Sequence, residues 1–105
     1  MERYGKIIKV KQEKFEYYKS LHANPWPEVT EAITKCNIRN FSIFCREGYL
    51  FSYYEYIGDD YARDMKKLGQ LTRHWLLETD ACQQPLETAA PGEWWIEMTE
   101  LFHHD

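Results

Sequence analysis

Two β-type segments joined by a short turn constrain the fold of this chain more than any other feature. Residues 38–45 and 49–57 are rich in β-branched and aromatic side chains, and Arg46-Glu47-Gly48 separates them, which is typical of a β-hairpin. Along the second segment, large apolar or aromatic side chains point to both sides of the strand. We therefore expect a sheet whose two faces are both covered.

The residues before the hairpin predict one strand and two helices. Residues 4–10 alternate as a first strand, and residues 12–21 carry an apolar stripe with helical spacing. Pro27 is acceptable at the first position of a second helix, which Asn37 is expected to end.

The residues after the hairpin predict one helix, a loop and a last strand. A helix is expected over residues 61–77. Residues 79–92 are expected to form a loop because they contain two prolines. Residues 94–102 show the alternation of a strand. The apolar side of this helix is expected to carry Met65, Leu68, Leu71 and Trp75.

The order of these elements is that of an α+β protein with the ferredoxin-like βαββαβ arrangement, in which the helices lie on one face of an antiparallel sheet. The other face, lined with Tyr and Phe, would be exposed in a monomer, and so large an aromatic patch usually means association. We therefore predict a homodimer that closes sheet on sheet. Residues 1–105 are expected to form a single domain.

Composition and charge exclude several classes of function. A formal net charge of −4 argues against a nucleic-acid partner. No apolar run approaches the roughly 20 residues of a membrane span, and the N-terminus lacks the apolar core of a secretory signal, so we expect a cytoplasmic protein with no membrane partner. The sequence predicts no metal site and no cofactor: the three cysteines are widely spaced, no glycine-rich phosphate loop is present, and the tail histidines have no third ligand.

The residues with the most chemical character stand at the end of the first helix. Tyr18 and His22 are one helical turn apart, so their side chains leave the same face. Pro25 and Pro27 cannot continue a helix, so His22 lies at a helix end. A histidine there can give or take a proton near neutral pH, although a structural role is an equally good interpretation from spacing alone.

A set of motifs along the whole chain resembles the L-rhamnose mutarotase family. The motifs are Tyr18-x3-His22, Trp26-Pro27-Glu28, Asn40-Phe41-Ser42-Ile43, Trp75 and Glu100-Leu101-Phe102. The resemblance implies a dimeric αβ barrel of ferredoxin-like protomers and an isomerase that interconverts the α and β anomers of a 6-deoxy-aldopyranose such as L-rhamnose. It also implies that His22 is the catalytic proton donor.

The resemblance further implies which residues bind the sugar. Tyr18 and Phe41 match sugar-binding positions, and the family's Trp-Trp pair is reduced here to Trp75, flanked by His74 and Leu76. We assign Tyr18, Phe41, Trp75 and Leu76 to the substrate site. The family usually has Tyr where this chain has Phe41, so one hydroxyl that could bond the sugar is absent.

The expected reaction needs only proton transfer. Ring opening requires a proton on the ring oxygen and removal of the anomeric hydroxyl proton, and His22 is assigned the first role. The base is water or a carboxylate such as Glu28. Two alternatives stay open at this point: a non-catalytic sugar or metabolite binder on the same scaffold, and a cofactor-free monooxygenase of the dimeric αβ barrel type.

Overall fold

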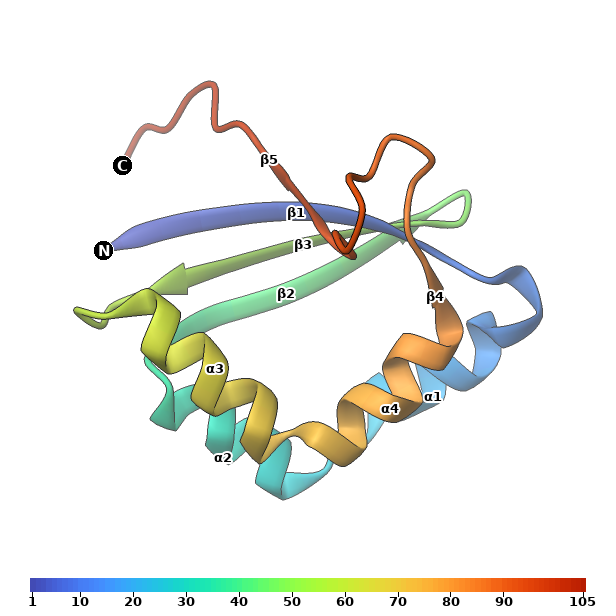
Figure 1. Ribbon diagram of the computed structural model, residues 1–105, viewed down its shortest axis with the longest axis horizontal. Coiled ribbons are helices and arrows are strands. Elements are labelled where there is room, and N and C mark those ends of the chain that lie inside the picture. The colour runs from blue at the N-terminus through green and yellow to red at the C-terminus, as the bar shows by residue number, and fades with distance from the viewer.

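The structure, a computed structural model, describes residues 1–105 and contains a single antiparallel sheet. The strands are β1 (Glu2–Val10), β2 (Ile38–Arg46), β3 (Tyr49–Tyr56), β4 (Gln83–Gln84) and β5 (Ile96–Met98). The order across the sheet is β2-β3-β1-β4, and β5 pairs separately with β1 (Figure 1). The first strand of the chain therefore lies in the middle of the sheet.

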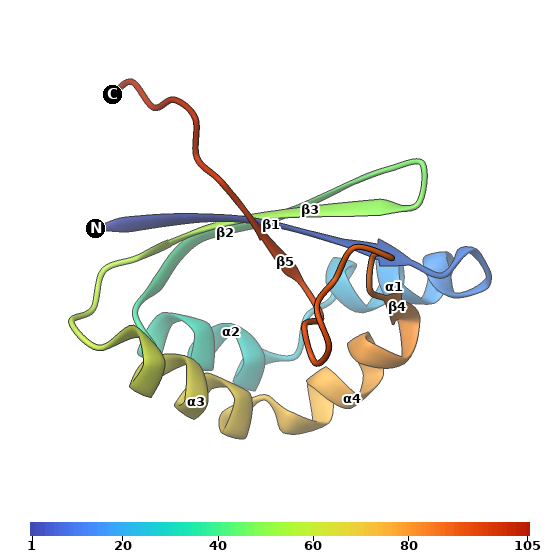
Figure 2. The same cartoon turned by 45° about the horizontal axis from the view of Figure 1, so that its top comes forward.

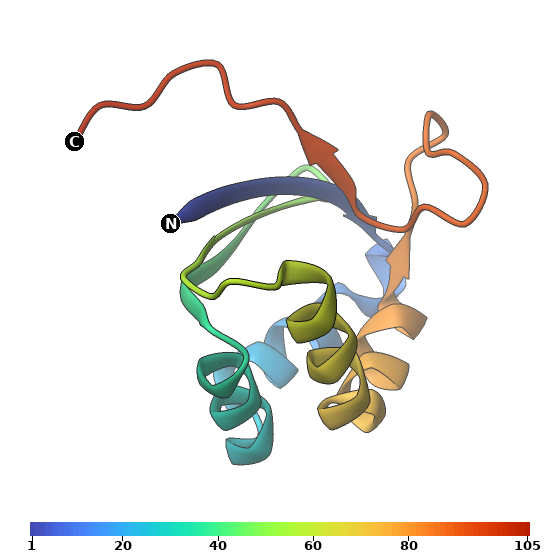
Figure 3. The same cartoon turned by 60° about the vertical axis from the view of Figure 1, so that its left-hand side comes forward.

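All helices lie on one face of this sheet. They are η1 (Gln12–Lys14), α1 (Phe15–Ala23), α2 (Pro27–Lys35), α3 (Tyr61–Leu71) and α4 (Arg73–Cys82). Figures 2 and 3 show the helices as one layer below the curled strands, with the C-terminal segment running from the sheet edge above them. This arrangement confirms the predicted α+β, ferredoxin-like topology, with β4 as a short last strand of the βαββαβ unit.

The hairpin between β2 and β3 is confirmed, and its turn explains the register. Glu47 and Gly48 have φ values of 54° and 83°, so both central turn residues are left-handed, as a two-residue type I′ turn requires. The turn pairs Arg46 with Tyr49 and so fixes the alignment of the two strands.

A β-bulge interrupts β2 close to its start. Arg39 pairs with Glu55 and Ser42 pairs with Tyr53, so Asn40 and Phe41 together oppose the single residue 54. Asn40 is the extra residue of the bulge, and its left-handed φ of 53° accommodates it. The bulge matters because it turns Phe41 toward the helix side of the sheet, where its ring centroid lies 5.4 Å from that of Tyr54.

The inner face of the sheet forms the core with the helices. Ile8 and Leu50 are fully enclosed beneath α1 and α4, while Tyr56 is buried near α3. The Tyr56 hydroxyl donates a hydrogen bond of 2.5 Å to the buried Asp64 carboxylate, which also accepts one of 3.1 Å from the Asn37 side chain. This polar network links β3, α3 and the end of α2.

The predicted helix over residues 61–77 is in fact two helices. α3 ends at Leu71, and α4 begins at Arg73, with Thr72 between them at φ −110° and ψ 20°. The Thr72 hydroxyl donates to the Leu68 carbonyl, and such back-bonding by a β-branched residue bends helices. Leu71, which the prediction placed on the apolar side, is exposed.

The predicted loop and last strand also differ from the structure. α4 continues to Cys82, which is buried against the sheet, and β4 follows directly, so the prediction of a loop from residue 79 was wrong for residues 79–84. The last strand covers only Ile96–Met98 of the predicted 94–102. Leu101 is 93% exposed, so an alternating pattern here does not mark a buried strand. No helix combines the length and the apolar character needed to cross a membrane.

Candidate active site

His22 lies in the last turn of α1, as predicted. Its Nδ1 is 2.8 Å from the backbone carbonyl oxygen of Tyr18. A carbonyl only accepts hydrogen bonds, so Nδ1 carries a proton, and Nε2 is the ring nitrogen that can exchange a proton with a ligand. Asn24 leaves the helical conformation at φ −135° and ψ 70°, which ends α1 just after the histidine.

Aromatic rings hold the His22 imidazole from two sides. The Tyr18 ring centroid lies 4.3 Å from that of His22, and the Trp75 ring meets the imidazole edge-on at 5.2 Å. Trp26 in turn contacts Trp75 at 5.2 Å between centroids. Tyr18 and Trp75 are 4% and 8% exposed, so these rings are well packed and restrict the orientation of the imidazole.

A cavity of about 860 Å³ lies between part of the sheet and the helices. The structure brings all five predicted site residues into its lining: Tyr18, His22, Phe41, Trp75 and Leu76. They come from α1, β2 and α4, which are far apart in the sequence. His74, the other neighbour of Trp75, is exposed and is not in the lining.

The charged groups in the lining are all basic. They are Lys6, Lys19 and His22, and no Asp or Glu side chain contributes. Glu28, considered as a base from the sequence, is exposed and lies outside the lining, so the cavity itself offers no carboxylate. Lys6 reaches toward the ring of Tyr54, with its Nζ 5.4 Å from the ring centroid.

Gln83 and Lys6 are lining residues that the sequence reasoning missed. Gln83 was placed in a loop, but it is a buried residue of β4 whose Nε2 donates a 3.1 Å hydrogen bond to the Tyr18 hydroxyl. Lys6 belongs to the predicted first strand and was not assigned to the site. An inward lysine in a strand that otherwise carries Tyr4, Ile8 and Val10 on that side was the available signal for a polar cavity.

Burial changes the acidity of the Tyr18 hydroxyl. Removal from water disfavours the phenolate and raises the pKa of Tyr18 to about 12, although the bond from Gln83 opposes this effect. At neutral pH the hydroxyl therefore keeps its proton and acts as a neutral hydrogen-bonding group.

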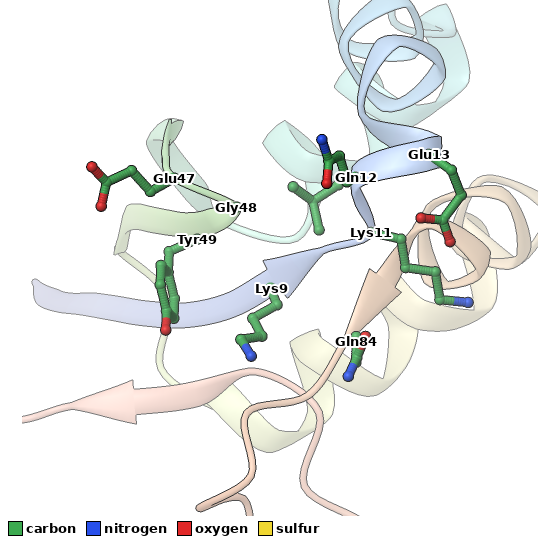
Figure 4. Close-up of a pocket in the computed structure, with 9 residues that line it drawn as sticks. Lys9, Lys11, Gln12, Glu13, Glu47, Gly48, Tyr49 and Gln84 are labelled. Atoms are coloured by element: carbon green, nitrogen blue, oxygen red, sulfur yellow. The ribbon is translucent and has the colours of Figure 1, made fainter.

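A second depression, of about 390 Å³, lies where the hairpin turn meets the end of β1. It is lined mainly by polar side chains, and Figure 4 shows Lys9, Gln12, Glu47 and Tyr49 pointing in different directions instead of converging on one point. None of the predicted site residues is part of it. The larger cavity is therefore the candidate functional site.

Comparisons with known proteins agree with the resemblance that the motifs indicated. The family model for L-rhamnose mutarotase matches residues 3–104. An L-rhamnose mutarotase of Bacillus subtilis is 31% identical, and one of Lactiplantibacillus plantarum is 26% identical, with all of each chain covered in both cases.

Solved structures share the fold. The L-rhamnose mutarotase of Formosa agariphila superposes over the full length of both chains with a TM-score of 0.74 at 22% identity. The tetracenomycin F2 cyclase of Streptomyces glaucescens, a type-II polyketide cyclase, also covers both chains, with a TM-score of 0.65 at 13% identity, so this architecture serves more than one chemistry. Because the family model spans nearly the whole chain and the Bacillus relative matches it throughout, the chain belongs to the L-rhamnose mutarotase family, a family of carbohydrate isomerases.

Proposed function

We propose that this protein interconverts the α and β anomers of a 6-deoxy-aldopyranose such as L-rhamnose, with His22 as the catalytic residue. One observation carries the assignment of the site: the cavity collects His22, whose Nδ1 is held by the Tyr18 carbonyl, together with the other four residues expected at the sugar site. The names of the full-length relatives supply the class of sugar.

The proposed reaction opens and recloses the pyranose ring. The His22 imidazolium gives the proton on Nε2 to the ring oxygen, a base takes the proton of the anomeric hydroxyl, and the bond between C1 and the ring oxygen breaks to leave an open-chain aldehyde. Rotation about the bond next to C1 presents the other carbonyl face. Attack of the ring-oxygen hydroxyl on that face, with both proton transfers reversed, gives the other anomer.

The base is best assigned to water. No carboxylate lines the cavity, and Glu28 is exposed and lies outside the lining, which favours water over Glu28 as the base. Once His22 has given up its proton, its Nε2 is itself a base, because Nδ1 keeps the proton that the Tyr18 carbonyl accepts. The same nitrogen can then take back a proton when the ring closes.

The sugar is proposed to bind between the aromatic side chains. Trp75 offers an indole face for the apolar side of the pyranose, Phe41 and Leu76 close the cavity around it, and the Tyr18 hydroxyl bonds to a sugar oxygen. A 6-deoxy sugar suits this lining, because its methyl group needs an apolar contact.

Exchange between anomers measured by one-dimensional NMR tests this proposal. L-rhamnose, L-fucose and other aldoses are screened with the wild-type protein, and His22→Asn is compared with His74→Asn, an exposed histidine outside the cavity. We expect His22→Asn to lose about 10²-fold or more in rate, the usual share of a general acid, with sugar binding changed much less. A folded His22→Asn protein that exchanges anomers at the wild-type rate would refute the assignment of His22.

We also propose that two copies of the chain pair through the outer face of the sheet. Ile7 is paired with Phe51 and with Ile96, and Phe51 is paired with Phe44, so four apolar residues form one row across this face. Phe44 is 66% exposed, and a second copy would bury the row. Sedimentation at micromolar concentration should show a dimer that Phe44→Glu dissociates, whereas a monomeric wild-type protein would contradict the proposal.

The cytoplasm is the proposed compartment, and residues 1–105 are proposed to act as a single domain. Cys36, Cys45 and Cys82 are all free thiols, and reduced cysteines suit a reducing compartment. One family model matches residues 3–104, which supports the single domain.

A further inference from the structure

A short chain of hydrogen bonds runs from the chain's C-terminal part to the hydroxyl of Tyr18. The indole Nε1 of Trp94 donates to Oε1 of Gln83 at 2.7 Å, and Nε2 of Gln83 donates to the Tyr18 hydroxyl at 3.1 Å. Gln83 is 3% exposed and lines the cavity, and its backbone is fixed by pairing of β4 with Val10 of β1.

The chemistry of Trp94 fixes the orientation of the Gln83 amide. An indole N–H only donates, so the group that faces it must be the amide oxygen, and the two ends of the amide cannot be exchanged. The amide nitrogen therefore faces Tyr18, and the phenol oxygen accepts. This is the only hydrogen bond of the Tyr18 hydroxyl in the structure, so its own proton is not used by a protein group.

We propose that Trp94 and Gln83 are positioning residues that present the Tyr18 hydroxyl as a hydrogen-bond donor to the sugar, and so require an oxygen that accepts a hydrogen bond at that place. The proposal rests on the proposed function, in which Tyr18 contacts the sugar. The ligand atom is the ring oxygen or a hydroxyl oxygen. An amino sugar whose ammonium group occupies this place is disfavoured, because an ammonium has no lone pair and would leave the Tyr18 hydroxyl proton without an acceptor.

The arrangement complements His22. Burial raises the pKa of Tyr18 to about 12, so the donor keeps its proton over the neutral range. One turn further along α1, Nε2 of His22 is a donor or an acceptor according to its protonation, because its Nδ1 is tied to the Tyr18 carbonyl. The cavity thus holds one group of constant donor character beside one that exchanges protons.

A double-mutant cycle separates this role from a structural one. The dissociation constant of L-rhamnose is measured by calorimetry for Gln83→Leu in the wild-type and Tyr18→Phe backgrounds, with KM and kcat from anomer exchange. We expect Gln83→Leu to weaken binding and raise KM by about threefold to tenfold, the share of one hydrogen bond, and to have no further effect in Tyr18→Phe. An equal loss in both backgrounds, or no loss in either, overturns the proposal.

Two further variants keep the test sound. Gln84→Leu, at the exposed neighbouring position on β4, is the matched control and should bind as the wild type does. Trp94→Phe keeps a ring but removes the N–H, which frees the Gln83 amide to turn over, and should weaken binding in the same direction as Gln83→Leu. If Gln83→Leu melts at a much lower temperature than the wild type, Trp94→Phe replaces it in the double-mutant cycle.

An arm without sugar distinguishes failure of this inference from failure of the proposed function. In the free protein, Gln83→Leu should shift both the indole N–H resonance of Trp94 and the Cζ resonance of Tyr18, and Gln84→Leu should shift neither. If the wild type neither binds nor interconverts any sugar, the proposed function fails, while the two shifts still decide the hydrogen-bond arrangement. Unshifted resonances in Gln83→Leu overturn it whatever the sugar results are.

Discussion

Gly58, two residues after the end of β3, occupies a place that no larger residue fits. A Cβ added there would lie 2.6 Å from Cζ of Tyr56 and 2.8 Å from Nδ2 of Asn37, and closer still to the Tyr56 hydroxyl oxygen. Both neighbours belong to the network that bonds the buried Asp64 carboxylate. Gly58→Ala must therefore displace at least one of its hydrogen-bonding groups.

The cost follows from two opposed effects. Overpacking a filled site typically costs about 1–3 kcal/mol, and a lost partner of a buried polar group adds about 1–3 kcal/mol. Restriction of the unfolded chain by alanine returns only about 0.4–1 kcal/mol. We expect Gly58→Ala to lower the free energy of unfolding by about 3 kcal/mol, which for a domain of this size lowers Tm by about 12–24 °C.

Gly69 provides the matched control for the same substitution. It lies inside α3, and an added Cβ would meet nothing within 4 Å. Gly69→Ala should therefore stabilise the protein by about 0.5–1 kcal/mol through helix propensity. Urea unfolding and thermal melts followed by circular dichroism measure both variants. A Gly58→Ala protein as stable as the wild type would show that the network does not depend on the close approach at Gly58.

Three further outcomes are expected. Hydrogen bonds from Tyr56 and Asn37 hold the pKa of Asp64 below its ordinary value, so the ionised carboxylate stabilises the fold above the unfolded pKa of about 3.9, and this stabilisation is lost as the pH falls through the folded pKa. In thermal melts between neutral and strongly acidic pH, the Tm of Asp64→Asn should therefore decline less with falling pH than that of the wild type. An equal decline in both proteins would contradict this. Trp75→Phe should reduce the fluorescence change on adding saturating sugar, whereas an identical response would leave Trp75 only a packing role. Phe41→Tyr supplies the hydroxyl that the family resemblance implies at this position and should tighten L-rhamnose binding by about threefold to tenfold in calorimetry. An unaltered affinity would argue against contact with the sugar at this position.

The regular parts of the fold were predictable because their signals are local. The hairpin has β-type segments on both sides of a turn whose residues favour left-handed φ values. Asn37 was predicted to end the second helix, and it has the left-handed φ of 67° that is common just after a helix. The break at Thr72 was not predictable from periodicity, because the apolar spacing continues through it from Leu68 to Trp75. The break coincides with the hydrogen bond from the Thr72 hydroxyl to the Leu68 carbonyl, and the spacing of apolar residues carries no information on that bond.

The composition of the candidate site was predictable where side chains share one helix and where the family resemblance supplied the rest. Tyr18 and His22 are one turn apart, so their contact follows from helix geometry. Phe41, Trp75 and Leu76 were assigned through the resemblance, and the cavity places them with His22. Gln83 could not be found in this way, because its position depends on the pairing of two residues of β4 with β1 across most of the chain.

Each of the three elements that supply the site departs from regular geometry next to the residue it contributes. α1 ends at Ala23, immediately after His22. β2 contains an extra residue at Asn40, immediately before Phe41. α4 begins after the break at Thr72, so Trp75 lies in its first turn. A continuous strand would have put Ile38 and Phe41 on opposite faces, since side chains alternate, and the bulge allows both to face the helices. The cavity is therefore made by interruptions of secondary structure, and the regular segments between them provide the core against which those interruptions are held.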